Sequence, residues 1–241
     1  MSLLKFRKKE RERKFDLVSH THPKSPLAEA YRTLRTNLGF AGVDQECRTI
    51  LISSPSPQDG KSTVISNLAV VMAQAGKKVL LVDCDLRKPV QHRVFNLSNQ
   101  KGFTNCLLNQ VSLEKVVQPG PLENLSVLTS GPIPPNPAEL LSSARTRDFW
   151  SFLRERYDYV LIDAPPVLAV TDAVVLASQV DGVVLVLKTG STRNTVAVQA
   201  RDQFTRANAR LLGVVLNQVE IDGPDYQYSY YYYYGHEESQ S

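Results

Sequence analysis

The residues after a short apolar stretch, Thr49 to Ser53, have the types and order of a phosphate-binding loop that leads into a helix. Backbone N–H groups of such a loop, together with the positive end of the helix, favour a polyphosphate. Lys61 would reach the β and γ phosphates, and the Ser62 hydroxyl would ligate magnesium. The predicted nucleotide contacts are Gln58, Asp59, Gly60, Lys61, Ser62 and Thr63. The usual first glycine is replaced by Pro55, so a Gly-Lys turn that only starts a helix is the alternative.

Aspartates stand at the ends of two other apolar stretches. Asp83 and Asp85 follow residues 79–82, and Asp163 follows residues 159–162. Ligands of open α/β sheets bind at the carboxyl ends of the strands, so these side chains should point toward the lysine loop. Asp163 fits a magnesium ligand, either direct or one shell further out. A single strand-end aspartate is more often a helix cap, but three facing one lysine loop are hard to explain in that way.

The elements that must position these residues alternate along the chain. Continuous apolar stretches rich in β-branched residues predict buried strands at Thr49–Ser53, Lys78–Asp83, Leu125–Thr129, Tyr159–Asp163, Gly182–Leu187 and Leu211–Leu216. Helical spacing predicts helices at Pro26–Phe40, Ser62–Ala75, Pro137–Arg156, Asp172–Ser178 and Thr192–Ala207. The alternation predicts an α/β fold: a doubly wound, mainly parallel sheet with helices on both faces, as in P-loop NTPases.

Length and composition divide the chain into one domain with a tail at each end. We predict a basic N-terminal arm over residues 1–22, a P-loop domain over 23–221 and a flexible tyrosine-rich tail over 222–241. Between Gly102 and Pro137 the pattern is irregular, and its Pro-Gly turns predict exposed loops.

Charge and hydropathy restrict the partners. The net charge of +4 comes from the first 14 residues, so the body is nearly neutral and no nucleic-acid partner is expected. The arm either rests on an anionic membrane surface or is a solvated terminus. No run approaches the roughly 20 apolar residues of a membrane-spanning helix, and no secretory signal is recognisable. Three cysteines without metal-ligand spacing fit a reducing cytoplasm. Any membrane role is expected to come through a partner or the arm.

The phosphate loop, the Asp-x-Asp-x-Arg sequence from Asp83 and the Asp-x-Pro sequence from Asp163 resemble those of bacterial tyrosine kinases. These kinases control capsule and exopolysaccharide synthesis and are relatives of the MinD and ParA ATPases. The likeness covers roughly Pro23 to Val219 and the tail. It implies ATP and Mg²⁺ as cofactors.

The same resemblance implies residue roles. Lys61, Asp83 and Asp85 would be catalytic, with Asp83 the best candidate for the base that takes the tyrosine hydroxyl proton. The implied magnesium ligands are Ser62, Asp83 and Asp163, and Asp85 would complete the metal environment. Asn217, which ends the last strand, would touch the base of the nucleotide, although an asparagine after a strand is more often a turn residue.

Two features favour this kinase over a dimer-driven ATPase of the MinD type. Those ATPases carry an extra lysine early in the loop, where this chain has Pro55. The tail holds seven tyrosines within nine residues, a composition that suits phosphoacceptors better than a core. They are Tyr226, Tyr228, Tyr230, Tyr231, Tyr232, Tyr233 and Tyr234. The alternative for the tail is an adhesive aromatic segment without chemistry.

A Glu-x-x-Arg-x-x-Arg sequence on the first predicted helix resembles the oligomerisation motif of these kinases. Glu29, Arg32 and Arg35 share one helix face and are predicted to pair across subunits of a ring. The alternative is a solvated charged face with an internal pair three residues apart.

The sequence therefore predicts a tyrosine kinase that autophosphorylates its own tail, between ring neighbours, and regulates capsule or exopolysaccharide synthesis. The resemblance implies a membrane-embedded activator of the polysaccharide co-polymerase type, which would recruit the cytoplasmic chain to the inner face of the plasma membrane. An opposing tyrosine phosphatase fits the same scheme. The main alternative is a non-kinase ATPase switch that scaffolds a polysaccharide machine, and a third is a membrane-surface adaptor that uses only the arm.

Overall fold

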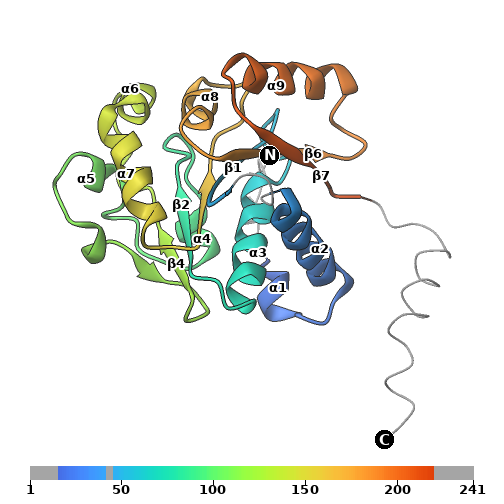
Figure 1. Cartoon of the computed structure of the whole chain (residues 1–241), viewed down its shortest axis with the longest axis horizontal. Helices are drawn as coiled ribbons and strands as arrows, with labels where there is room; N and C mark the ends of the chain where they lie inside the picture. The colour runs from blue at the N-terminus through green and yellow to red at the C-terminus, as the bar shows by residue number, and fades with distance from the viewer. Residues whose placement is uncertain (1–15, 42–45, 220–241) are drawn as a thin grey trace, which may run out of the picture.

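A seven-stranded sheet with helices on both faces forms the body of the computed structural model, which describes residues 16–41 and 46–219 (Figure 1). The strands are β1 (Thr49–Ser53), β2 (Val79–Asp83), β3 (Gln118–Pro119), β4 (Leu125–Leu128), β5 (Tyr159–Asp163), β6 (Gly182–Lys188) and β7 (Leu211–Asn217). Their spatial order is β3-β4-β2-β5-β1-β6-β7. Only β3 pairs in the antiparallel direction, at one edge of the described sheet. The predicted fold class is confirmed.

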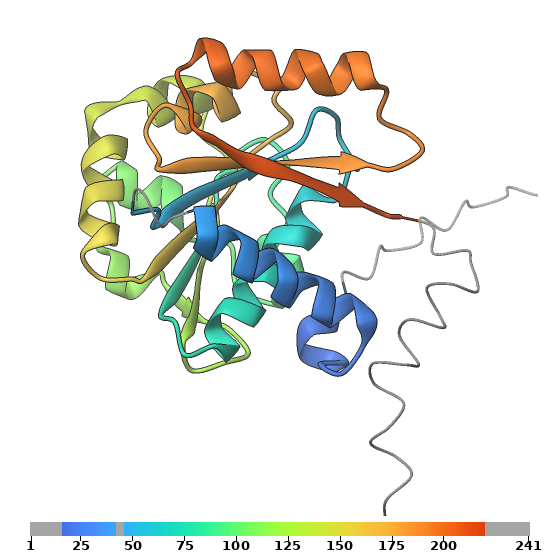
Figure 2. The ribbon, with the colours of Figure 1, turned by 45° about the vertical axis from the view of Figure 1, so that its right-hand side comes forward.

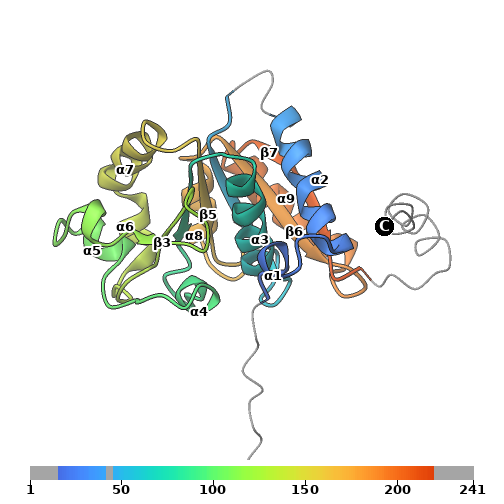
Figure 3. The same ribbon diagram turned by 90° about the horizontal axis from the view of Figure 1, so that it is seen from below.

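The helices divide between the two faces of the sheet. They are α1 (Val18–Thr21), α2 (Pro26–Ala41), α3 (Lys61–Gln74), α4 (Gln91–Val94), α5 (Phe103–Leu107), the 3₁₀ turn η1 (Leu113–Lys115), α6 (Pro137–Ser142), α7 (Ala144–Arg154), α8 (Asp172–Ala177) and α9 (Asn194–Arg206). Figure 2 shows α9 on one side of β6 and β7 and α2 on the other. Figure 3 shows α1 beside α3, in agreement with their contacts.

The central strands are buried on both faces, as their continuous apolar sequences predict. In β1, Leu51 belongs to the hydrophobic core that includes residues of α5 to α9, while its neighbours Ile50 and Ile52 belong to the core that includes residues of α2 and α3. All three side chains are at most 1% exposed. Because successive strand residues point to opposite faces, one strand serves both cores.

The segment from Pro137 to Arg156, predicted as one helix, is two helices. Ser143 has ψ 154°, an extended conformation that ends α6 after Ser142. Its hydroxyl then accepts a hydrogen bond from the Thr146 N–H at 3.4 Å and caps α7. A serine that bonds a nearby backbone N–H favours a helix start over a helix interior, and this local competition breaks the helix.

The segment from Gly102 to Pro137 was predicted as exposed loops, and this prediction is wrong for most of its first half. Phe103, in α5, is fully buried and stacks on Trp150 of α7, with ring centroids 5.6 Å apart. Leu107 and Val116 are also buried in the same core. The elements here are only two to five residues long, too short to reveal a periodic pattern.

The described part of the chain includes residues 16–22, which fall within the stretch predicted as a basic arm. The Ser19 N–H donates to Asn67 Oδ1 at 2.9 Å, and Asn67 Nδ2 donates to the Asp16 carbonyl at 3.1 Å. Hydrogen bonds to Asn67 thus attach the segment 16–22 to α3. Within the ranges 16–41 and 46–219, no helix is both long and apolar enough to cross a membrane.

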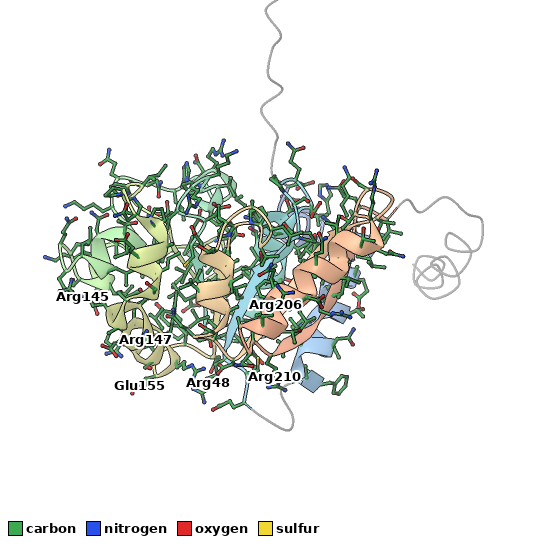
Figure 4. The ribbon with its side chains drawn as sticks, turned by 90° about the horizontal axis from the view of Figure 1, so that it is seen from above. Arg48, Arg145, Arg147, Glu155, Arg206 and Arg210 are labelled. Carbon is green, nitrogen blue, oxygen red and sulfur yellow. The ribbon has the colours of Figure 1, made fainter. Side chains whose placement is uncertain are left out.

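Arginines gather on the edge of the sheet where the parallel strands begin (Figure 4). Arg48, just before β1, donates to the carbonyl of Arg154, the last residue of α7, at 3.1 Å. Arg210, just before β7, donates to the carbonyl of Ala41, the last residue of α2. Arg206 lies in the last turn of α9. Positive side chains stabilise the exposed carbonyls of helix C-termini, so these arginines serve the fold on the edge opposite the phosphate loop.

Candidate active site

The strand order brings together residues that are far apart in sequence. β5 lies between β1 and β2, so the phosphate loop after β1 and the aspartates that end β2 and β5 meet at one edge. Asp83 and Asp163 are direct partners in the parallel register, and Asp163 is also opposite Ile52 of β1. The topology therefore assembles the predicted site at the carboxyl edge of the sheet, where ligands of this fold class bind.

Backbone geometry gives the phosphate loop its shape. Gln58 and Gly60 have positive φ angles, 75° and 98°, the left-handed conformation that anion-binding loops use. The Asp59 carboxylate accepts the Ser56 N–H at 2.9 Å and closes the turn. Asn217 Nδ2 donates to the Asp59 carbonyl at 2.9 Å, so the end of β7 fastens the loop. The expected contact of Asn217 with the nucleotide base stays a prediction.

Lys61 is the centre of charge in the site. Its Nζ lies 3.0 Å from Asp85 Oδ2, 3.1 Å from Asp163 Oδ1 and 3.0 Å from Ser62 Oγ. Burial alone lowers the pKa of Lys61, but the charges of Asp163 and Asp85 outweigh it and leave the pKa raised. The ammonium is therefore always charged at neutral pH and acts as the counter-ion of the aspartates.

Asp83 is fully buried and held by the backbone. Oδ2 accepts the N–H groups of Val90 at 3.0 Å and Gln91 at 2.9 Å, while Oδ1 accepts the Asp85 N–H at 3.2 Å. Desolvation and the nearby charge of Asp163 raise the pKa of Asp83 to about 7, against the lowering effect of the Gln91 hydrogen bond. Each carboxylate oxygen has two lone pairs, so Oδ1 keeps one for a further donor.

Sequence reasoning missed Gln91, the first residue of α4. Its side chain is fully buried and Nε2 donates to Asp163 Oδ2 at 2.7 Å. Its Oε1 accepts from Ser66 Oγ of α3 at 2.8 Å. A single glutamine forms no sequence pattern that would predict a contact with Asp163, so only the tertiary structure reveals it.

Arg87, the arginine of the Asp-x-Asp-x-Arg sequence, binds a helix that follows much later in the chain. Its guanidinium forms two 2.9 Å bonds to both carboxylate oxygens of Asp172, the fully buried first residue of α8. The bond to Asp172 raises the pKa of Arg87. The pair ties the loop after β2 to the helix after β5, and the sequence separation of 85 residues explains why no local pattern predicted it.

The donor set fits a magnesium nucleotide. Ser62 and Asp163 offer hard oxygen ligands beside a lysine that already holds a positive charge among the aspartates. No group of three or more His, Cys, Asp or Glu side chains in the described part of the chain is arranged to hold a metal alone. Magnesium usually takes one or two carboxylates and completes its shell with water and phosphate oxygens, so this set suffices.

The predicted oligomerisation residues behave differently from one another. Arg32 pairs with Glu29 of the same helix at 2.6 Å and donates to the Pro23 carbonyl at 2.6 Å. Arg35 instead donates to the Val71 carbonyl in α3 at 3.0 Å. The internal pair is thus formed within one subunit, and pairing across a ring stays a prediction. The tail tyrosines and residues 1–15 lie outside the described residues.

Comparisons with known proteins agree with this geometry. A domain family described as AAA domain matches residues 47–200. The tyrosine-protein kinase YwqD of Bacillus subtilis is 48% identical over 202 residues, covering 84% of this chain and 85% of the relative. The putative tyrosine-protein kinase CapB of Staphylococcus aureus is 39% identical over 214 residues, covering 89% and 94%.

Solved structures lead to the same family. The chimerical protein CapA2B2 superposes with a TM-score of 0.81 and 42% identity, covering 84% of this chain and 89% of that one. MinD of Pyrococcus horikoshii, solved with Mg-ADP, has a TM-score of 0.61 at 24% identity over 76% of each chain and shares the fold. With a P-loop site of this geometry and full-length relatives of this identity, the chain belongs to the family of bacterial tyrosine-protein kinases.

Proposed function

We propose that the chain is an ATP- and Mg²⁺-dependent kinase that phosphorylates the tyrosine cluster of its own C-terminal tail, between neighbouring subunits. The observation that carries the proposal is the meeting of Lys61, Asp163 and Asp83 at the phosphate loop. Phosphoryl transfer asks a protein mainly for alignment and charge stabilisation, which a fixed lysine and fixed carboxylates supply.

Lys61 is the residue proposed to hold the transferred phosphoryl group. In the nucleotide-free chain its ammonium is paired with Asp85 and Asp163, so phosphate binding requires a new partner for the same charge. Magnesium, when bound through Ser62 and Asp163 beside Asp83, would supply the positive charge that offsets the phosphate oxygens. Asp85, freed from the lysine, would complete the carboxylate environment.

Asp83 Oδ1 is proposed to accept the proton of the attacking tyrosine hydroxyl. The tyrosine oxygen forms a bond to the γ-phosphorus, the bond from that phosphorus to the bridging oxygen of ADP breaks, and ADP leaves. A pKa raised to about 7 by burial and the charge of Asp163 suits a general base, because proton transfer is most effective when the pKa lies near the working pH.

Assembly and recruitment complete the proposal. The Glu29–Arg32 pair is partly exposed and can exchange partners at low cost, which suits a ring contact between subunits. Each phosphorylated tyrosine adds about −1.5 to −2 charges, so a phosphorylated tail would repel its neighbours and open the ring. We further propose regulation of capsule or exopolysaccharide synthesis and recruitment to the plasma membrane by a membrane-embedded activator. The likeness to the CapA2B2 chimera supports a search for such a polypeptide.

The decisive experiment is incubation of the purified chain with Mg²⁺ and γ-labelled ATP, with and without a candidate activator peptide. Mapping by mass spectrometry should place phosphate within Tyr226 to Tyr234, and Asp83→Asn should lower the rate by about 100-fold or more. Asp202→Asn, at an exposed ion pair, is the matched control. If ATP is hydrolysed while every tyrosine stays unmodified even with the peptide, the ATPase switch is the better account.

A further inference from the structure

Gln91 is the residue that connects the two strand-end aspartates. It is 0% exposed. Its backbone N–H donates to Asp83 Oδ2 at 2.9 Å, and its side-chain Nε2 donates to Asp163 Oδ2 at 2.7 Å. One residue of α4 therefore holds carboxylates from both β2 and β5.

The direction of these hydrogen bonds is fixed by chemistry. An ionised carboxylate only accepts hydrogen bonds, so the amide nitrogen of Gln91 must face Asp163. Its oxygen then faces Ser66 Oγ at 2.8 Å and accepts from it. The single hydrogen of that hydroxyl is shared between the amide oxygen and the Ser62 carbonyl, which lies 2.6 Å away. Gln91 thus links Ser66 of α3 to Asp163 of β5.

The hydrogen bond from Gln91 sets the orientation of the Asp163 carboxylate. With Oδ2 occupied by Gln91, only Oδ1 faces Lys61, at 3.1 Å. An apolar side chain of equal volume would fill the same space without the cost of burying an amide. The amide nitrogen donates to Asp163 and, at 3.4 Å, to the Ser62 carbonyl, both in the nucleotide site, which indicates a role in that site rather than in packing alone.

We propose that Gln91 is a positioning residue for the magnesium-bound nucleotide, because it orients Asp163 so that Oδ1 faces the metal and the phosphates. The inference rests on the proposed metal-ligand role of Asp163. Residues that orient a metal ligand through a hydrogen bond typically change metal affinity or activity by 10–100-fold when they are replaced.

The test compares Gln91→Met with wild type and with Gln179→Met. Methionine keeps the length of the side chain and removes its three hydrogen bonds, with Asp163, Ser66 and the Ser62 carbonyl. Gln179, a half-buried glutamine after α8, donates its side-chain amide to the carbonyls of Leu141 and Val175, away from the nucleotide site, and serves as the matched control. The measurements are Mn²⁺ affinity with ADP bound, by electron paramagnetic resonance, and fluorescent ADP affinity in EDTA.

Gln91→Met is expected to weaken Mn²⁺ binding by about 10–100-fold while ADP binding in EDTA stays the same. Ser66→Ala removes the bonds of that hydroxyl to the amide oxygen and to the Ser62 carbonyl but keeps the bond from Gln91 to Asp163. It should cause a smaller loss in the same direction, and it decides the question if Gln91→Met does not fold. Wild-type Mn²⁺ affinity in a folded Gln91→Met or, failing that, in Ser66→Ala overturns the inference. Asp163→Asn separates failure of the Gln91 inference from failure of the proposed metal site. If Asp163→Asn also binds Mn²⁺ with wild-type affinity, Asp163 is not a metal ligand and the proposed metal site is wrong.

Discussion

The charged residues of the site are buried and are stabilised by residues of opposite charge. Lys61 is only 9% exposed and Asp163 is 0% exposed, so neither charge is solvated well without the other. Removing one member of a buried ion pair is strongly destabilising because the partner charge remains buried. The lysine of the phosphate loop therefore has a structural role before any nucleotide arrives.

Lys61→Met is expected to destabilise the nucleotide-free protein by roughly 3–5 kcal/mol at pH 8 and by less at pH 5, where the unpaired carboxylates take up protons. Urea unfolding at the two pH values measures the difference. Lys77→Met, at an exposed lysine, is the control and should change little. Equal unfolding midpoints for Lys61→Met and wild type would contradict the counter-ion role.

Asp83 should make the folded chain less stable as pH rises. Its pKa is raised from 3.8 to about 7, mainly by burial and the charge of Asp163, so between these values the folded state binds more protons than the unfolded state. Stability contributed by this group is greatest below pH 4 and falls as pH rises to 7, by at most about 4 kcal/mol at 1.36 kcal/mol per unit.

The measurement is urea unfolding at pH 5 and pH 8, in EDTA and without nucleotide. Asp83→Asn should show a smaller loss of stability between the two pH values than wild type, and Asp202→Asn should match wild type. The same loss in all three proteins would mean that Asp83 titrates normally.

Among the elements, α8 and the loop after β2 are joined by one ion pair. Arg87 is partly exposed, but Asp172 is fully buried and accepts two bonds from it. The loop carries Asp85, so the pair also steadies the carboxylate that faces Lys61. Loss of the arginine would leave a buried acceptor without its donor.

Arg87→Met should therefore cost about 1–3 kcal/mol of stability, the range for a buried polar group left unsatisfied. Arg201→Met provides the contrast, since the exposed Arg201–Asp202 pair contributes about 0–1 kcal/mol. Chemical denaturation of both variants checks the difference. If the two variants lose equal stability, the bidentate pair is only a surface contact.

For the whole molecule, the question is how one subunit meets another. Glu29 and Arg32 are 42% and 31% exposed and pair with each other, whereas Arg35 binds the Val71 carbonyl inside the subunit. Exchange of the first pair for a partner across an interface costs little, because a surface pair contributes about 0–1 kcal/mol. Arg35 has a fixed position in the fold and is less free to exchange.

We expect the combined change Glu29→Ala and Arg32→Ala to abolish a ring without altering the thermal midpoint of the monomer by more than a few degrees. Light scattering coupled to size exclusion, before and after ATP, measures assembly and its reversal. Arg201→Ala with Asp202→Ala, an exposed pair on α9, is the control and should assemble as wild type does. Unchanged assembly in the α2 variant would move the interface elsewhere.

The sequence by itself determined the fold class, and it predicted the phosphate loop and the strand-end aspartates that the fold brings together. Buried parallel strands are continuous apolar runs, and the phosphate loop is contiguous from Ser54 to Thr63, so both are visible locally. Local signals also located the ends of most elements to within two residues, such as Lys61–Gln74 for the predicted Ser62–Ala75. They failed where elements are very short, as around Phe103, because a periodic pattern needs more residues than those elements contain.

Only the tertiary structure decided which distant residues meet. The order β2-β5-β1 makes Asp83 and Asp163 register partners, and the loop after β2 then carries Gln91 to Asp163 and Arg87 to Asp172. Strand order and register are set by the packing of whole elements, and hydrogen bonds act over about 3 Å in space regardless of sequence distance. A single sequence records the types of these residues but not the distances between them.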